Sequence, residues 1–158
     1  MQVLYHASPQ KNLKIIEPKR TLSNNKYIGD YVFATSNRTL AAMYLAVKGH
    51  AILMNAKEDP YIIICADEQE YSSKDKGGAI YTVPAVTFEV TPQAGLEDSE
   101  QVSKTPVKPL KKAEYQSSID ALREMNAKIY FVNEKEFNGL LKAKDEKKQL
   151  ASLRPAAA

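Results

Sequence analysis

The chain is poor in cysteine and in long apolar runs. Its single cysteine, Cys65, excludes an internal disulfide and a zinc site built from cysteines. Cys65 ends the apolar run of residues 61–65, so we expect a small buried side chain in a reducing compartment. No stretch approaches the roughly 18 apolar residues of a membrane span, and residues 1–10 lack the layout of a signal peptide. We therefore expect a cytoplasmic protein without a membrane partner.

Several motifs for cofactor binding and catalysis are also missing. The six glycines are scattered, and neither G-x-G-x-x-G nor G-x-x-x-x-G-K-[ST] occurs, which excludes nucleotide binding through those phosphate loops. No serine lies in a G-x-S-x-G elbow. The two histidines, His6 and His50, are far apart and lack the spacing of H-E-x-x-H. We therefore expect no dedicated metal site.

The composition is that of one folded domain. Charged residues make up 26% of the chain and hydrophobic residues 44%, and 158 residues are enough for one core but too few for two. The net charge of +3 is too small to imply nucleic acid by itself, although residues 142–154 are locally basic. We expect a single domain over residues 1–155. The three alanines at 156–158 resemble a cloning tail.

The pattern of apolar residues predicts an α+β fold. Strands are predicted at residues 2–5, 31–35, 51–54, 61–65, 79–83, 86–90 and 128–132, and a short extended segment is predicted at 101–103 with Glu100 at its entrance. Helices are predicted from Ser36 or Asn37 to residue 47, over 117–125 and over 134–153, and residues 11–30 are predicted to be an irregular surface excursion. Because the elements do not alternate strictly, they favour one or two largely antiparallel sheets. His6 is expected at the end of the first strand, because Pro9 cannot continue a ladder.

Three short segments carry a family resemblance. They are Leu4-Tyr-His-Ala-Ser-Pro9, the segment YVFATSNRTLAAMY at 31–44, and Glu100-Gln-Val-Ser103 followed by Pro106-Val107. Together they resemble the ADP-ribosyltransferase superfamily, in particular its His-Tyr-Glu branch of poly(ADP-ribose) polymerase-like proteins and bacterial and phage proteins that begin LYHGSP. The resemblance spans residues 2–109. It implies split antiparallel β-sheets with flanking helices, and NAD as a substrate used without a metal.

The resemblance implies roles for four residues of the first and last segments. His6 would hydrogen-bond a ribose hydroxyl, and Ala7 stands where the family has a glycine whose backbone holds the carboxamide. Ser8, next to it, would also contact NAD. Glu100 would be the catalytic glutamate. This role fits the chemistry, because breaking the bond between nicotinamide and ribose develops positive charge that a nearby carboxylate stabilises as it forms.

The middle segment would supply an aromatic ring for the nicotinamide. Tyr44 resembles the stacking tyrosine of the catalytic set, and Tyr31 and Phe33 compete with it for this role. Arg20 and Lys19 would neutralise the pyrophosphate. Each proposed site residue also has an ordinary alternative: a structural hydrogen bonder for the histidine, a core position for the aromatic residues, and a solvated charge for the others.

The predicted activity is NAD-dependent transfer of ADP-ribose to an unidentified macromolecular or small-molecule acceptor, with release of nicotinamide. Two alternatives remain open. With water as the acceptor the protein would be an NAD glycohydrolase. Without catalysis it would be a module that binds ADP-ribose or a nucleic acid.

The C-terminal part is expected to be structural. The strand at 128–132 is predicted to dock on the sheet that carries His6, and the final helix to cover it. The basic residues of this part are expected to form a solvated face; the alternative is that they attract an acidic acceptor such as nucleic acid. They are Lys142, Lys144, Lys147, Lys148 and Arg154.

Overall fold

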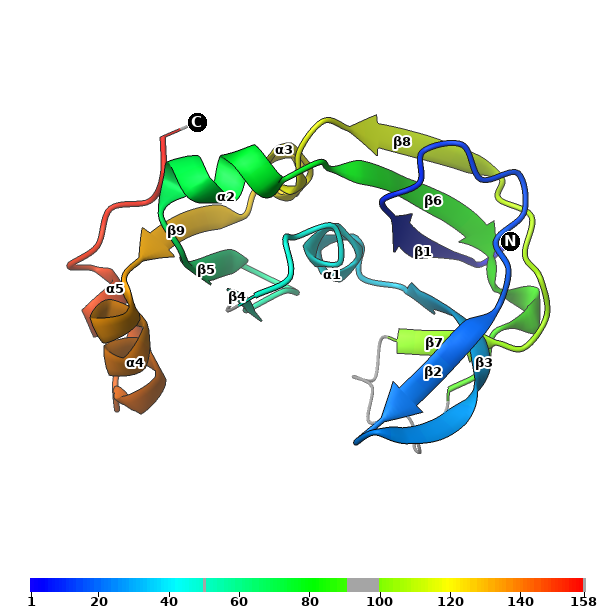
Figure 1. Cartoon of the computed structure of the whole chain (residues 1–158), viewed down its shortest axis with the longest axis horizontal. Coiled ribbons are helices and arrows are strands. Elements are labelled where there is room, and N and C mark those ends of the chain that lie inside the picture. Colours follow the sequence, from blue (N-terminus) through cyan, green and yellow to red (C-terminus); the bar gives the residue numbers. More distant parts are fainter. Residues whose placement is uncertain (50, 91–99, 158) are drawn as a thin grey trace.

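The computed structural model describes residues 1–49, 51–90 and 100–157 (Figure 1). The strands of its larger sheet are β1 (Val3–Ser8), β2 (Lys19–Ser23), β3 (Lys26–Thr35), β6 (Gly78–Pro84), β7 (Glu100–Ser103) and β8 (Lys111–Tyr115). They pair in the order β2-β3-β1-β6-β8, with β7 also on β3, and every pair is antiparallel. The N-terminal half of the chain thus contributes its first three strands to this sheet.

The smaller sheet consists of β4 (Ala51–Met54), β5 (Tyr61–Cys65) and β9 (Lys128–Val132), with β5 antiparallel to β4 and parallel to β9. The helices are α1 (Arg38–Met43), α2 (Glu68–Lys74), α3 (Ser118–Glu124), α4 (Glu134–Lys142) and α5 (Glu146–Leu150), and a 3₁₀ turn, η1, spans Ala85–Thr87. The described part of the chain is therefore a single α+β domain with mainly antiparallel sheets, as predicted. None of the helices within the described ranges combines the length and apolar character needed to cross a bilayer.

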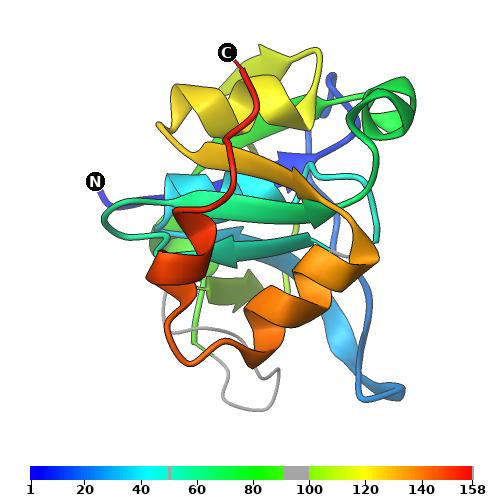
Figure 2. The ribbon, with the colours of Figure 1, turned by 90° about the vertical axis from the view of Figure 1, so that its left-hand side faces the viewer.

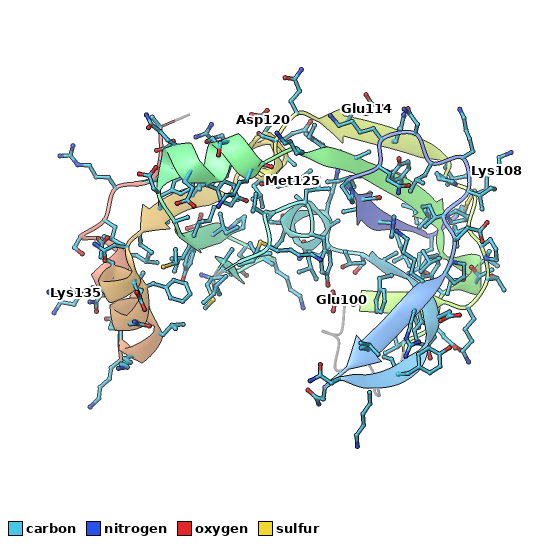
Figure 3. The ribbon with its side chains drawn as sticks, viewed as in Figure 1. Glu100, Lys108, Glu114, Asp120, Met125 and Lys135 are labelled. Atoms are coloured by element: carbon cyan, nitrogen blue, oxygen red, sulfur yellow. The ribbon has the colours of Figure 1, made fainter. Side chains whose placement is uncertain are left out.

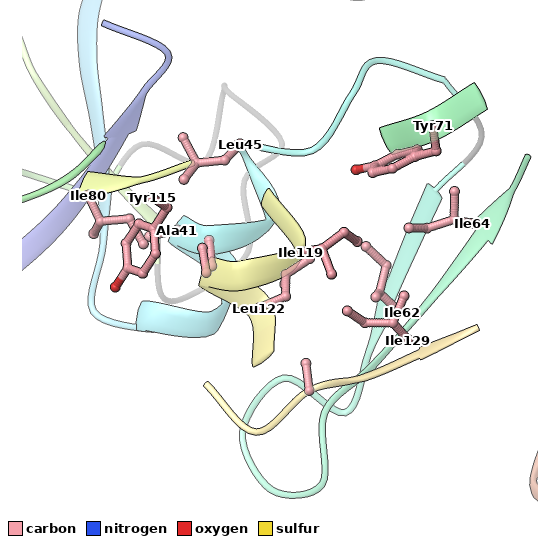
Figure 4. Packing of buried hydrophobic residues seen from close by; sticks show 13 residues of the cluster. Ala41, Leu45, Ile62, Ile64, Tyr71, Ile80, Tyr115, Ile119, Leu122 and Ile129 are labelled. Carbon is pink, nitrogen blue, oxygen red and sulfur yellow. The ribbon is translucent and has the colours of Figure 1, made fainter. Parts of the chain in front are cut away.

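The main core lies between the two sheets and encloses α1 and α3 (Figures 1 and 4). Ile80 of the larger sheet and Ile62 and Ile129 of the smaller sheet belong to one buried cluster with Ala41 of α1 and Leu122 of α3. The alanine lets the two helices approach closely, and burying an isoleucine or leucine contributes about 1.5–3 kcal/mol. The two sheets are thus held together by apolar packing on both helices.

Helices α4 and α5 cover the other face of the smaller sheet (Figure 2). Phe137, Leu140 and Leu150 pack there with Tyr130 and Val132 of β9. Residues Ile129 and Tyr130 face opposite sides because side chains alternate along a strand. The final helices therefore cover β9, as expected, but β9 belongs to the smaller sheet and not to the sheet that carries His6. That part of the prediction is wrong, since β9 extends β5 in parallel.

A buried carboxylate joins α2 to α3. Asp75 is 8% exposed and accepts hydrogen bonds from the Ser118 N–H at 2.8 Å, the Ser118 hydroxyl at 2.8 Å and the Gly77 N–H at 3.2 Å. Gly77 has φ +63°, and a Cβ added there would lie 2.2 Å from the Tyr115 carbonyl oxygen. The tight turn that brings Asp75 to the start of α3 therefore requires glycine.

A β-hairpin replaces the second half of the predicted surface excursion. β2 and β3 are joined at Asn24 and Asn25, whose φ angles are 49° and 62°. Asparagine tolerates this left-handed conformation, so the pair forms the kind of tight turn for which Asn-Gly is known in hairpins. The prediction for residues 11–30 is wrong from Lys19 onward, because exposed, mostly polar strands give no regular apolar alternation.

Other element predictions need correction. Residues 86–90 do not form a strand: η1 turns the chain after Pro84, and Val86 is 87% exposed. The first helix ends at Met43 and not at residue 47. The predicted final helix is divided into α4 and α5, because Ala143 takes an extended conformation with ψ 133°. α2 and β8 were not predicted, since short polar elements resemble loops in sequence.

Two further expectations concern single residues. Cys65 is only partly buried at the end of β5 and not fully buried, because it is the last residue of the strand. The N–H of Ala156, within the proposed tail, donates to the Ile129 carbonyl at 2.6 Å, and its side chain packs against the main core. Residue 156 is therefore in contact with the folded domain, and residue 158 lies outside the described ranges.

Candidate functional site

A cavity of about 640 Å³ opens beside β1, β2 and β3. Its walls come from these strands, the segment that follows β1, the residue after α1 and the start of β7. The structure brings all the predicted site residues into the lining of this one cavity, which we call the pocket. They are His6, Ala7, Ser8, Lys19, Arg20, Tyr31, Phe33, Tyr44 and Glu100.

The pocket forms where β1 and β3 separate. The two strands pair at a single position, Tyr5 opposite Thr35, whereas β1 stays paired with β6 as far as Ser8. β3 instead continues along β7 and β2. Because side chains alternate along β1, Tyr5 and Ala7 point to one face of the sheet and His6 and Ser8 to the other. Both sets line the pocket, so it reaches across the gap between the two strands.

His6 bridges this gap. Its Nδ1 lies 2.6 Å from the Phe33 carbonyl oxygen, and since a carbonyl only accepts, Nδ1 carries the proton. Burial lowers the pKa of His6 below 6.5; the bond to Phe33 opposes this shift and the charge of Lys19 adds to it. At neutral pH the ring is therefore neutral, with Nε2 as a hydrogen-bond acceptor. His6 lies inside β1, not at its end as predicted, because the strand continues to Ser8 before Pro9 ends it.

Glu100 is the buried carboxylate of the pocket. It is the first residue of β7 and is 5% exposed, so it is not the solvated loop charge of the alternative interpretation. Glu100 is opposite Thr35, which is opposite Tyr5, so these three side chains form a row on one face across β7, β3 and β1. Figure 3 shows Glu100 at the end of β7 nearest to α1. Glu17, a second carboxylate of the lining, is exposed.

The three candidate aromatic residues have different surroundings. Tyr31 is 9% exposed, donates its hydroxyl to the Ile28 carbonyl at 2.9 Å and meets Phe33 edge-on, with 6.2 Å between ring centroids. A Cβ at Gly29 would lie 2.7 Å from the Tyr31 ring, so the ring covers this glycine. Tyr44, the residue after α1, is 55% exposed and is therefore no core residue. Tyr44 is the ring most accessible to a ligand.

Cations and apolar side chains complete the lining. Lys19 and Arg20 come from β2 and are exposed, and the Arg20 guanidinium lies 5.3 Å from the centre of the Tyr27 ring. Leu13 and Ile16 form an apolar wall that the sequence did not reveal, because no periodic pattern marks their segment. Tyr81 helps to hold this wall, since its hydroxyl accepts the Leu13 N–H at 3.1 Å.

The predicted C-terminal basic residues lie elsewhere. The side chains of Lys142, Lys144, Lys148 and Arg154 are exposed on or near α4 and α5, and none of them lines the pocket. In Figure 1 these helices are at the opposite end of the molecule from β2 and β3. The Lys147 side chain lies outside what the structure describes, as does His50.

The described residues contain no cluster of three histidine, cysteine, aspartate or glutamate side chains that could hold a metal ion. No family model, curated protein sequence or solved structure matches the chain. The function must therefore be inferred from the pocket itself.

Proposed function

We propose that the pocket binds NAD and that the protein transfers ADP-ribose from NAD to an acceptor, releasing nicotinamide. The observation that carries this proposal is that His6, Tyr44 and Glu100, which come from three distant segments, line one pocket. The divergence of β1 from β3 is consistent with the split sheet of an ADP-ribosyltransferase fold, which we propose for this domain.

The pocket has suitable size and chemistry for a dinucleotide. Its volume of about 640 Å³ falls within the range of about 300–1,000 Å³ that is usual for small-molecule sites. Lys19 and Arg20 would neutralise the pyrophosphate, and the neutral His6 would accept a hydrogen bond from a ribose hydroxyl through Nε2. Tyr44 would stack on the flat, cationic nicotinamide ring. Each part of NAD thus has a partner of matching chemistry.

Glu100 would act as the bond to nicotinamide breaks. The electron pair of that bond moves to the ring nitrogen of nicotinamide, which becomes neutral, and positive charge develops on the ribose. Glu100 would stabilise this charge in a site with little water, where a carboxylate is less screened than on the surface. The acceptor then attacks the ribose carbon and loses a proton. Positioning and electrostatics are sufficient for such a reaction.

A second candidate, a binding module without catalysis, rests on Ala7. Ala7 is opposite Ile80 in the regular ladder between β1 and β6, so no left-handed backbone is needed at this position. Ala7 nevertheless lines the pocket, where the resemblance would place a glycine. The question is therefore whether the methyl group of Ala7 allows NAD to take a reactive pose.

Two measurements on the purified protein test these possibilities: NAD binding by calorimetry and nicotinamide release by mass spectrometry. Binding with release supports the proposed enzyme, and free ADP-ribose formed in equal amount without an added acceptor identifies a glycohydrolase. Binding without release supports the module, and release gained by Ala7→Gly would assign the loss to the methyl group. Absence of NAD binding by both proteins would overturn the proposal.

A further inference from the structure

A group of lysines borders the pocket on two segments that run side by side. Residues 11–16 and 104–112 are joined at Ile16 and Val107, whose N–H groups each donate to the other's carbonyl at 2.8 and 3.0 Å. Lys112 Nζ also donates to the Asn12 side-chain oxygen at 3.1 Å. We call the lysines of these segments the lysine ridge. They are Lys11, Lys14, Lys104, Lys108, Lys111 and Lys112.

Much of the positive charge of the ridge is not neutralised. Lys104 pairs with Glu89 at 3.8 Å and Lys112 with Glu114 at 2.7 Å. The other exposed ridge lysines form no ion pair with the residues that the structure describes; they are Lys14, Lys108 and Lys111. Exposed lysines without carboxylate partners create a positive potential that attracts a polyanion.

The ridge shares a wall with the pocket. Leu13 and Ile15 line the pocket, whereas Lys14, between them, is exposed and is not part of the lining. One segment of chain therefore separates the ridge from the pocket. Figure 3 shows Lys108 at the opposite end of the molecule from Lys135 of α4. The lysines on the pocket side, and not those of the C-terminal helices, are placed to hold a molecule that reaches the pocket.

We propose that the lysine ridge binds the phosphate backbone of a nucleic acid beside the pocket. Phosphate contacts from lysine and arginine dominate protein–nucleic acid interfaces. Interfaces with proteins are instead depleted in lysine and need an apolar centre. Among the ridge segments, Leu110 is the one large apolar side chain besides Ile15 that is prominently exposed in the described structure. The ridge therefore fits a nucleic acid better than an acidic protein.

This inference deepens the proposed function by naming the acceptor class, and it rests on that function only for the acceptor role. Binding of nucleic acid by the ridge is independent of NAD, so ridge binding and NAD turnover are tested separately.

The test variant carries Lys14→Glu, Lys108→Glu and Lys111→Glu, and the control variant carries Lys135→Glu, Lys144→Glu and Lys148→Glu. Each reversal subtracts two charges, so both variants change the formal net charge from +3 to −3.

Binding of a fluorescein-labelled single-stranded oligonucleotide is measured by anisotropy at several salt concentrations. If all six lysines contact phosphates, log Kd changes with log salt with a slope of about 4 in the unmodified protein and about 2 in the test variant. We expect the test variant to bind at least about tenfold more weakly at moderate salt, and the control variant to retain most of the affinity. Thermal melting checks that both variants are folded.

Equal weakening of both variants would show that net charge alone drives binding and would overturn the proposal. So would unchanged binding by the test variant, absence of binding by the unmodified protein, or tighter binding of polyglutamate than of the oligonucleotide. Nicotinamide release is measured in parallel. Oligonucleotide binding that depends on the ridge, without any NAD turnover, would refute the proposed enzyme while leaving the ridge assignment in place.

Discussion

Replacing Glu100 by glutamine removes a charge from the pocket while nearly preserving the shape of the side chain. Glu100 is 5% exposed, so water screens its charge less than that of a surface carboxylate. At an effective dielectric constant near 20, a carboxylate about 5 Å from a unit positive charge contributes about 3 kcal/mol. This corresponds to a change on the order of 10²-fold in rate. We expect kcat to fall by this factor or more and NAD affinity to change much less, because the charge develops only in the transition state.

The two effects are separated by measuring nicotinamide release at saturating NAD and NAD binding by calorimetry. Glu17→Gln is the matched control: it removes the same charge from an exposed residue of the same pocket, and we expect kcat to change by no more than a factor of a few. An unchanged kcat in a folded Glu100→Gln protein would refute the reasoning. Equal losses in the two variants would show that the overall charge of the pocket matters and not the position of Glu100.

Three other substitutions or conditions give sharp expectations. NAD affinity should fall as the pH decreases from 6.5 through the lowered pKa of His6, because the protonated ring no longer accepts a hydrogen bond at Nε2. The stability contributed by the neutral buried ring should be lost over the same pH range. Calorimetry and thermal melting at several pH values check both effects, and His6→Gln should remove the pH dependence. Tyr44→Ala should weaken NAD binding, measured by calorimetry, without lowering the melting temperature, since the side chain is 55% exposed. A large fall in the melting temperature would instead show that Tyr44 is a packing residue. Asp75→Ala should reduce the free energy of unfolding, measured with urea, by about 3 kcal/mol or more, because several donors lose their buried acceptor. The control Asp67→Ala, at the exposed N-cap of α2, should reduce it by about 1 kcal/mol. Similar losses in the two variants would contradict this account.

The sequence predicted the apolar elements well and the polar ones poorly. The strands at 51–54, 61–65 and 128–132 were predicted with the bounds that the structure has, because β-branched or apolar runs there are bounded by polar residues. The hairpin of β2 and β3, α2 and β8 escaped prediction because these elements carry many polar, exposed residues. The choice of sheet for β9 depends on long-range pairing with β5, which no local pattern encodes.

The candidate site could be predicted as a set of residues but not as a geometry. The resemblance of short segments identified His6, Tyr44 and Glu100, and these residues line one pocket. Nothing in the sequence indicated that His6 would bond to the Phe33 carbonyl, because that contact depends on how far two strands separate. The burial of Glu100 could not be predicted either, since its neighbours in sequence include several charged residues, which usually mark an exposed loop. Their roles in NAD chemistry stay predictions.

Where β1 separates from β3, a more stable sheet and a larger pocket exclude each other. A ladder extended beyond Tyr5 and Thr35 would add hydrogen bonds to the sheet and fill the space that a ligand would use. The bond from His6 to Phe33 ties the two strands without closing them, so it acts as a spacer. Substitutions that join the two strands should therefore raise the thermal stability of the protein and reduce the volume of the pocket. Engineering for higher thermal stability would have to keep β1 and β3 apart at this position.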